Sequence, residues 1–464
     1  MKHFKFLSIS IFLLTILFAC KEHVLSPIGG GSDEEINEWI YKTMEANYLW
    51  YEEVPEKESL DFSLSPDDFF YTLLSNKDGR ELNGKHQYFS YIEADNQTKA
   101  STNESVYGFE FASLGFTGQN YYYAWVLYVL PGSPADEAGL KRGDWIVRIN
   151  SEQGYITDLN NLVAGNAATF YLAKYIDNET GFVPNGSIEI EAARVVEDNP
   201  FLKDTVFHIG EKSIAYLVYN HFTSGPTGNS DETYNNQMKQ IFANFKAKQA
   251  NELVLDLRYN GGGLVTCAQL MTSLIAPSSA LGDTFCILEF NDKNTNRNVI
   301  YPLITSVASS NLNLNKKIYV LTSLMTASAS EAVINCLAPF IGRENIVLIG
   351  TQTLGKTVGS ISFGESEKVG WILHPITLHI FNKKHEADYK NGFPPTSGFE
   401  IDELVVGQTL YELGDRRELL LSRAIQEITG QVTPKTSFYK TTERKAVNYN
   451  SFGKKRIQGL IINP

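Results

Sequence analysis

Two segments in the C-terminal half constrain the fold of this chain more than any other part of it. Residues 318–331 (IYVLTSLMTASASE) and 346–357 (IVLIGTQTLGKT) are both apolar, β-branched runs that end abruptly in small residues. Such runs are typical of buried strands. The first run leads to Ser328 at the start of a predicted helix, and the second leads to Lys356 after a glycine. A serine and a lysine on adjacent strand ends are sufficient for acyl transfer without histidine.

Length and composition set the broad class of the protein. A chain of 464 residues predicts about three domains. Hydrophobic residues make up 43% of the chain and aromatic residues 12%, which is enough for packed cores. The formal net charge of −13 argues against nucleic acid as a partner.

The N-terminus has the pattern of a targeting segment. Lys2 and Lys5 precede an apolar run over residues 6–17, and Leu17-Phe18-Ala19-Cys20 resembles a bacterial lipobox. A plain signal peptide or an anchor helix fits less well, because the apolar run is short for a membrane span. We therefore expect residues 1–20 to be a lipoprotein signal peptide. Lipidated Cys20 would then anchor the protein in the outer membrane, on its periplasmic or cell-surface face.

The remaining cysteines, Cys267, Cys286 and Cys336, are widely spaced. Their number and spacing match neither a disulfide framework nor a metal site. We expect small buried side chains at these positions, and neither a metal nor a cofactor.

Changes in composition and in the predicted pattern of strands and helices divide the chain into an N-terminal module, two domains and a tail. Residues 21–100 form a glycine-rich tether and a small helical module. Residues 101–200 contain short strands and turns, and residues 201–430 alternate strands with helices. The expected fold class is a multidomain α/β protein. Residues 431–464 carry seven Lys or Arg against one acidic residue and form a basic tail with no predicted function.

The middle region resembles a PDZ domain. The resemblance rests on a turn, short helix and turn over residues 132–150, which include Gly132-Ser133-Pro134-Ala135 and Gly143-Asp144. Gly108, Phe109, Glu110 and Phe111 stand where that family has its carboxylate-binding loop. Successive backbone N–H groups there would hold a terminal carboxylate while the strand edge pairs with the peptide. The alternative is an ordinary small β-domain with a glycine turn.

Two motifs of the third region have structural as well as functional interpretations. Asp256-Leu257-Arg258 leads into Gly261-Gly262-Gly263, which could direct amides into a site or could be only a turn. Asp256 and Arg258 could be a structural ion pair. Ser328 with Glu331 matches a capping box, yet a serine at a helix N-terminus is also where a nucleophile sits.

The segment Gly350–Thr357 matches the Walker A pattern of nucleoside triphosphatases. That motif requires a helix immediately afterwards. Residues 358–363 are β-branched and interrupted by glycine, which predicts a strand instead. The context therefore disfavours a P-loop.

Taken together, these motifs resemble the carboxyl-terminal processing, or tail-specific, serine peptidases. The resemblance implies a crotonase-like α/β protease core in which Ser328 is the nucleophile and Lys356 the general base. It also implies an oxyanion hole formed by the backbone N–H groups of Ala329 and Gly262, or less certainly Gly261.

One position departs from the pattern of that family. A glutamine often follows the lysine by four residues to orient it, and this chain has Ser360 there. The third catalytic member therefore stays open. His208 and His221, the histidines upstream of Ser328 in this region, have no recognisable carboxylate partner and are expected to be structural.

A lysine must be uncharged to act as a base. Lowering its pKa from about 10.4 to about 7 corresponds to roughly 4–5 kcal/mol, which burial can supply. The resemblance implies an endopeptidase that takes polypeptide substrates by their C-termini. The alternative from another class is a non-catalytic PDZ protein that only binds peptides.

Overall fold

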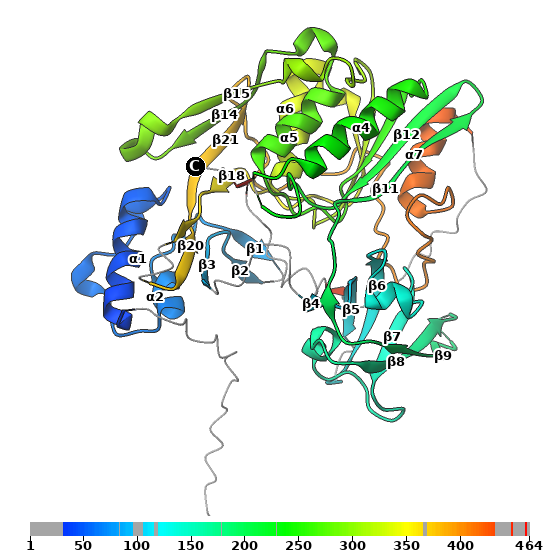
Figure 1. Cartoon of the computed structure of the whole chain (residues 1–464), viewed down its shortest axis with the longest axis horizontal. Coiled ribbons are helices and arrows are strands. Elements are labelled where there is room, and N and C mark those ends of the chain that lie inside the picture. The colour runs from blue at the N-terminus through cyan, green and yellow to red at the C-terminus, as the bar shows by residue number, and fades with distance from the viewer. Residues whose placement is uncertain are drawn as a thin grey trace, which may run out of the picture.

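The computed structural model describes residues 31–82, 84–95, 105–115, 119–177, 179–228, 230–364 and 369–431. It also gives the backbone of two short strands near the C-terminus, β22 (Val447–Asn448) and β23 (Leu460–Ile461). Figure 1 shows an N-terminal module, a β-domain and an α/β core. The predicted signal peptide and Cys20 lie outside the described residues.

The core is built on a five-stranded sheet with the order β11-β12-β13-β16-β17. Its strands are β11 (Phe201–Ile209), β12 (Lys212–Tyr219), β13 (Glu252–Asp256), β16 (Ile318–Thr322) and β17 (Ile346–Gly350). The strands from β12 to β17 pair in parallel, and β11 is antiparallel to β12. Both apolar runs singled out in the sequence are thus neighbouring central strands, β16 and β17.

Helices cover both faces of this sheet (Figure 1). They are α4 (Thr233–Ala247), α5 (Val265–Ile275), α6 (Ala329–Ile341) and α7 (Leu419–Thr429). Alternate strand residues point to opposite faces. Leu255 and Val320 accordingly pack in a core cluster with α4, α5 and α6, whereas Val254 and Leu321 pack with α7.

A second sheet of the core carries the segment that follows Lys356. Its strands, in the order β15-β14-β21-β18-β23, include β14 (Thr284–Phe290), β15 (Val299–Pro302), β18 (Val358–Ser360) and β21 (Ile376–Asn382). β18 pairs antiparallel with β21 on one side and parallel with the backbone of β23 on the other.

The N-terminal module packs directly on the core. The predicted helical character is confirmed by α1 (Asp33–Asn47) and α2 (Pro66–Thr72), which are capped by Ser32 and Ser65. It also contains three short strands that the sequence analysis did not predict: β1 (Arg80–Leu82), β2 (Lys85–Gln87) and β3 (Tyr91–Ala94). β3 pairs with β20 (Trp371–His374), which pairs with β19 (Phe363–Gly364). This small sheet therefore joins the N-terminal module to the core.

The β-domain is an antiparallel sheet with the order β22-β5-β6-β7-β8-β9. Its strands are β5 (Phe109–Gly115), β6 (Tyr122–Val129), β7 (Trp145–Ile149), β8 (Ala168–Tyr175) and β9 (Phe182–Ile190). The short helices α3 (Pro134–Glu137) and η3 (Leu159–Val163) complete it, and β4 (Ser105–Val106) pairs with β10 (Arg194–Val195) beside it. The predicted turn, helix and turn are present, with Ser133 as the cap of α3.

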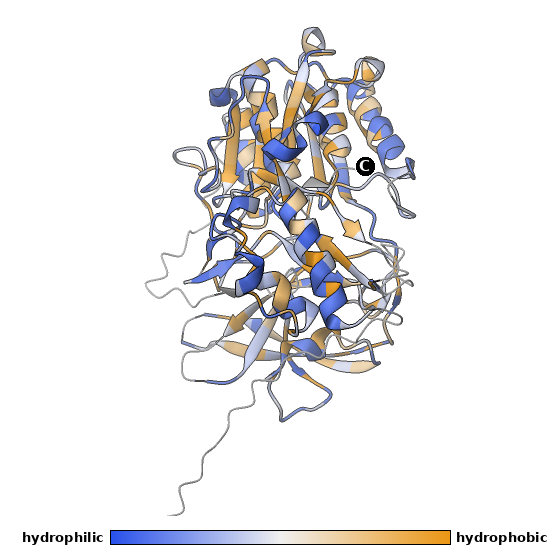
Figure 2. Cartoon of the chain, turned by 90° about the vertical axis from the view of Figure 1, so that its left-hand side faces the viewer, coloured by the Kyte–Doolittle hydropathy of each residue, from blue (hydrophilic) through white to orange (hydrophobic). Residues whose placement is uncertain are grey.

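Figure 2 shows apolar strands inside the core, with mixed helices around them. None of the helices in the described residues combines the length and the apolarity that crossing a bilayer would require. Cys267, Cys286 and Cys336 are buried free thiols, as predicted.

Candidate functional site

Ser328 occupies a sharp turn between β16 and helix α6. Its backbone has φ 56° and ψ −110°, a strained conformation for a residue with a side chain. Strain of this kind persists only where the surroundings enforce it, and it is concentrated at functional sites. The hydroxyl is completely buried and makes no hydrogen bond. Because a buried hydroxyl without a partner is costly, a purely structural role does not account for it.

Glu331 joins the serine turn to the loop that carries Lys356. One carboxylate oxygen accepts the backbone N–H of Ser328 at 2.9 Å and that of Lys356 at 2.8 Å. The other accepts the Thr353 hydroxyl and the Gly355 N–H, both at 2.6 Å. The backbone N–H groups of Ser328 and Lys356 therefore share one acceptor atom, which holds the two segments close together.

This arrangement also decides against a P-loop. The element that follows the loop is strand β18 and not a helix. The amides of Gly355 and Lys356, which a phosphate would need, are already occupied by the Glu331 carboxylate. The Walker A match is thus a coincidence of sequence. The group that the loop amides bind is the carboxylate of Glu331.

Lys356 is buried, with a relative exposure of 1%. Burial lowers its pKa from the usual 10.5 to about 8, and the nearby carboxylates of Asp78 and Glu331 act in the opposite direction. The amine lies 5.0 Å from the ring centre of Phe89. The direction agrees with the sequence-based expectation, although the pKa stays above the expected value of about 7. In the described conformation the Ser328 hydroxyl is not hydrogen-bonded to the amine.

The glycine turn lies beside the serine turn. The carbonyl of Asn260 accepts the Ala327 N–H at 3.1 Å and the Ser330 hydroxyl at 3.0 Å. The side chain of Asn260, however, accepts the N–H of Gly262 at 2.9 Å. In this conformation that amide is therefore already hydrogen-bonded, and its role in an oxyanion hole stays a prediction. Ala329 is the first residue of α6, where an N–H group has no acceptor within the helix.

Ser360 is buried on β18 and pairs with Ile376 of β21. Among the described residues, no hydrogen bond joins its hydroxyl to Lys356, so its orienting role stays a prediction. Asp256 and Arg258 form a buried ion pair at 2.7 Å, which agrees with their structural interpretation.

The residues predicted to bind a peptide carboxylate lie at the start of β5. Gly108 has φ +83°, and a Cβ added there would come within 2.2 Å of Ser133. The side chains of Phe109 and Phe111 are buried in the core of the β-domain, so only their backbone could bind a peptide. Glu110 is buried as well.

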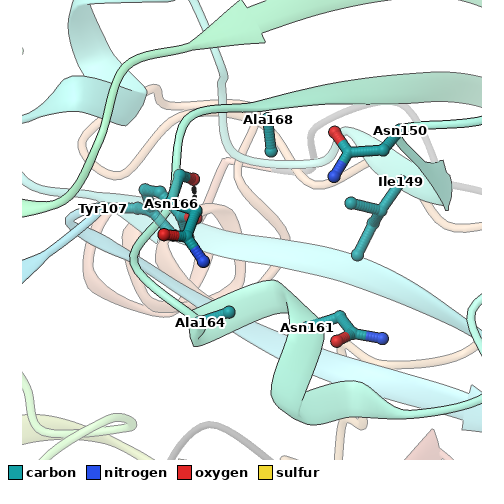
Figure 3. A pocket seen from close by; sticks show the side chains of 7 residues that line it. All are labelled: Tyr107, Ile149, Asn150, Asn161, Ala164, Asn166 and Ala168. Atoms are coloured by element: carbon teal, nitrogen blue, oxygen red, sulfur yellow. Dashed lines mark hydrogen bonds between the residues drawn. The ribbon is translucent and has the colours of Figure 1, made fainter.

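A pocket of about 260 Å³ lies in the β-domain (Figure 3). It is lined by Tyr107, Ile149, Asn150, Asn161, Ala164, Asn166 and Ala168. The Tyr107 hydroxyl donates to the carbonyl of Asn166 across it. None of the residues predicted to act in catalysis lines this pocket.

The two histidines upstream of Ser328 have partners other than the serine. His208 contacts Ser213 and His221 contacts Asn220, so neither serves Ser328. The structure also contains a row of hydrogen-bonded side chains, Ser362, His374 and Glu93, which the sequence spacing did not indicate; we call it the Ser-His-Glu line. His374 contacts the Ser362 hydroxyl at 2.8 Å and Glu93 at 3.2 Å. Ser362 precedes a strand rather than a helix, so this line lacks the helix N-terminus that Ser328 has.

Comparison with known proteins places this geometry in a family. Residues 213–396 match peptidase family S41, residues 35–91 the peptidase S41 N-terminal domain, and residues 125–164 the PDZ domain. A crystal structure from Bacteroides fragilis, assigned to the S41 proteases, is 32% identical with a TM-score of 0.74. The match covers 85% of this chain and 98% of that one. The chain belongs to peptidase family S41.

Two curated relatives extend the comparison. Carboxy-terminal processing protease CtpA of Bacillus subtilis is 27% identical over 60% of this chain and 54% of its own length. Carboxyl-terminal-processing peptidase 1, chloroplastic, of Arabidopsis thaliana is 28% identical over 57% of this chain and 52% of its own length. The chain therefore spans about half the length of the curated relatives it matches. The S41 match includes Ser328, Glu331 and Lys356, and the N-terminal match includes Asp78 and Phe89.

Proposed function

We propose that this S41 protein is a serine endopeptidase that uses Ser328 as nucleophile and Lys356 as general base. The observation that carries the proposal is the single Glu331 oxygen that accepts the backbone N–H of both residues. It brings the two chain segments together although they come from different strand ends. The strained turn and the unpartnered hydroxyl of Ser328 support the same assignment.

The proposed reaction follows from these groups. The neutral amine of Lys356 takes the proton of the Ser328 hydroxyl as its oxygen attacks a peptide carbonyl. The proton then passes to the leaving amine, and water hydrolyses the acyl-enzyme. The Ala329 N–H at the start of α6 would stabilise the oxyanion. Gly262 could contribute only after its N–H leaves Asn260.

Ser328 and Lys356 are both buried, so a polypeptide reaches them only after the site opens. The described conformation is closed. We expect the PDZ domain to bind the C-terminus of a polypeptide through the backbone at Gly108 and β5. We further expect lipidated Cys20 to hold the enzyme in the outer membrane, and we expect neither a cofactor nor nucleic acid to take part.

The test is covalent labelling of the full chain with a fluorophosphonate, followed by mass spectrometry. We expect the label on Ser328, and loss of peptide cleavage by several orders of magnitude in Ser328→Ala, because the covalent route is removed. Ser362→Ala is the matched control, since this serine belongs to the Ser-His-Glu line, and it should keep both labelling and cleavage. A label on Ser362, or an unchanged Ser328→Ala variant, would contradict the proposal.

The same experiment distinguishes the proposed peptidase from a protein that binds peptides without cleaving them. Such a protein would bind peptides but show neither label nor turnover. A nucleotide-binding protein would bind ATP in a manner that Lys356→Ala abolishes.

A further inference from the structure

The N-terminal module buries a carboxylate close to the predicted general base. Asp78 is completely buried. One of its oxygens accepts the backbone N–H groups of Phe89 at 3.0 Å and Ser90 at 3.1 Å. The other accepts the hydroxyl groups of Tyr48, at 3.0 Å, and Ser90. Two backbone N–H groups and two hydroxyl groups thus surround the Asp78 carboxyl. Burial raises its pKa, and these four hydrogen bonds lower it.

Asp78, Arg80 and Phe89 of the module lie beside the Lys356 segment. The Phe89 ring lies 5.0 Å from the amine. The Arg80 guanidinium donates to the carbonyl of Leu354, two residues before Lys356. On the other side, the Ser90 hydroxyl accepts the N–H of Ile376, which pairs with Ser360 of β18. The module is thus attached to the chain on both sides of the base.

Charges from two parts of the protein face the amine. The module contributes the carboxylate of Asp78, with Arg80 nearby, and α6 contributes Glu331. The Tyr48 hydroxyl donates to the Asp78 carboxylate, and His86 contacts the backbone carbonyl of Asp78. The charge of Glu331 acts on Tyr389 and helps to raise its pKa. Of these groups, Asp78 has the largest influence in favour of the charged amine. In the part of the chain that the structure describes, no direct ion pair joins it to Lys356.

We propose that Asp78 is the positioning residue of the general base, a role that rests on the proposed function of Lys356. Its carboxylate holds the Phe89–Ser90 turn against the amine and supplies the negative charge that the amine faces. The position of the orienting glutamine is Ser360 here, and its hydroxyl is not bonded to Lys356. The orienting group instead comes from another domain, far away in sequence.

The charge makes the proposal testable through pH. An anionic neighbour favours the ammonium form, so removing it lowers the pKa of the amine. A base works in its neutral form, so the acidic limb of the pH–rate profile should move to lower pH. In Asp78→Asn we expect that limb to shift by on the order of one pH unit. We also expect the maximal rate to fall at least tenfold, because the Phe89–Ser90 turn loses an acceptor.

The readout is the rate of fluorophosphonate labelling at Ser328, measured from pH 6 to 10 together with peptide cleavage. Tyr48→Phe is the matched control, because it removes one hydrogen bond to Asp78 but leaves its charge. It should lower stability without moving the limb. Circular dichroism and thermal unfolding of each variant show whether the fold is retained.

The outcomes separate this inference from the proposed function. If the wild-type protein is not labelled at Ser328, the proposed function fails, and this inference with it. If the wild type is labelled and the folded Asp78→Asn variant has an unmoved limb, only the role of Asp78 is overturned. An equal shift in Tyr48→Phe would also overturn it, since the charge would not be the cause. If Asp78→Asn does not fold, Asp78→Glu replaces it, because this variant keeps the charge but displaces it. Asp78→Glu must then lower the rate and leave the acidic limb of the pH–rate profile near its original pH.

Discussion

At the scale of single residues, Glu331 determines how the site is assembled. Its two oxygens accept four hydrogen bonds from the serine turn and the lysine loop. The carboxyl is fully buried, which raises its pKa, while these donors lower it. From the sequence it was a capping-box glutamate, and only the structure shows that it also holds the second loop.

Replacing Glu331 with Gln should therefore damage both stability and activity. An amide has one acceptor oxygen, and its NH₂ group would face N–H donors. We expect a loss on the order of 3 kcal/mol in the free energy of unfolding, and a loss of cleavage of at least a hundredfold. Denaturant unfolding and peptide cleavage measure the two effects. Glu344→Gln, at an exposed site, is the control and should change neither. An active Glu331→Gln variant of normal stability would contradict this role.

The ionisation of Lys356 leads to a second prediction at this scale. Its pKa is lowered to about 8 by burial, and the neutral amine is the active form. Cleavage by the wild-type protein should therefore increase as the pH rises through about 8 and then level off. A profile of kcat/KM from pH 6 to 10 measures this. An acidic limb near pH 6 would indicate a histidine base instead.

At the scale of elements, the loop between β17 and β18 has to turn sharply to bring its amides to Glu331. Gly355 lies at φ +95°, and a Cβ there would come within 2.4 Å of the Lys390 carbonyl oxygen and 2.5 Å of the Gly392 nitrogen. Only glycine fits this turn, for reasons of both conformation and space.

Gly355→Ala should lower the free energy of unfolding by about 2 kcal/mol or more, since it adds a clash to a strained conformation. Activity should fall with it, because Lys356 follows directly. Gly210→Ala is the matched control. It also has positive φ (58°), but nothing lies within 4 Å of the added Cβ. Comparable losses in both variants would show that conformation alone, and not the close approach, explains the glycine.

At the scale of the whole molecule, a buried charge network connects the β-domain with the core. Arg142 of the β-domain donates to Glu403 at 2.7 Å and to the Tyr259 hydroxyl at 2.6 Å. Arg258 donates to the same Glu403 oxygen at 2.7 Å and to Glu418 at 2.6 Å. Burial would raise the pKa of Glu403, yet the two guanidinium groups hold it at about 2.

Breaking this network should uncouple the domains. Arg142→Met removes one of the two guanidinium donors to Glu403 and the donors to the backbone carbonyls of Leu127 and Tyr411. We expect a loss of about 3 kcal/mol or more in the free energy of unfolding. Urea unfolding measures the loss, and Lys141→Met, next in sequence but exposed, is the control. The stabilisation by Glu403 is present above its unfolded pKa and is lost as the pH falls towards 2. An Arg142→Met variant as stable as the control would argue against a structural link.

Much of this protein could be predicted from local sequence. The β-branched runs at 318–322 and 346–350 are buried central strands, because only such side chains fill both faces of a parallel sheet. Ser32 and Ser65 cap helices, since these signals act over a few residues. The ordered motifs around Ser328 and Lys356 resembled the carboxyl-terminal processing serine peptidases, and the comparison with known proteins confirmed this by placing the chain in family S41.

Other features depended on contacts between distant residues, and no local pattern could predict them. Asn260 occupies the Gly262 amide, and Glu331 occupies the amides that resemble a P-loop. Asp78 and Phe89 reach Lys356 through contacts between distant segments, which include the pairing of β3 with β20 and the hydrogen bond from Ile376 to Ser90. Sequence alone determined which strands, turns and reactive side chains the protein has, because these follow from short-range sterics and hydrophobic pattern. Tertiary structure alone decided which partner each buried polar group meets, because that depends on which distant segments exclude water together.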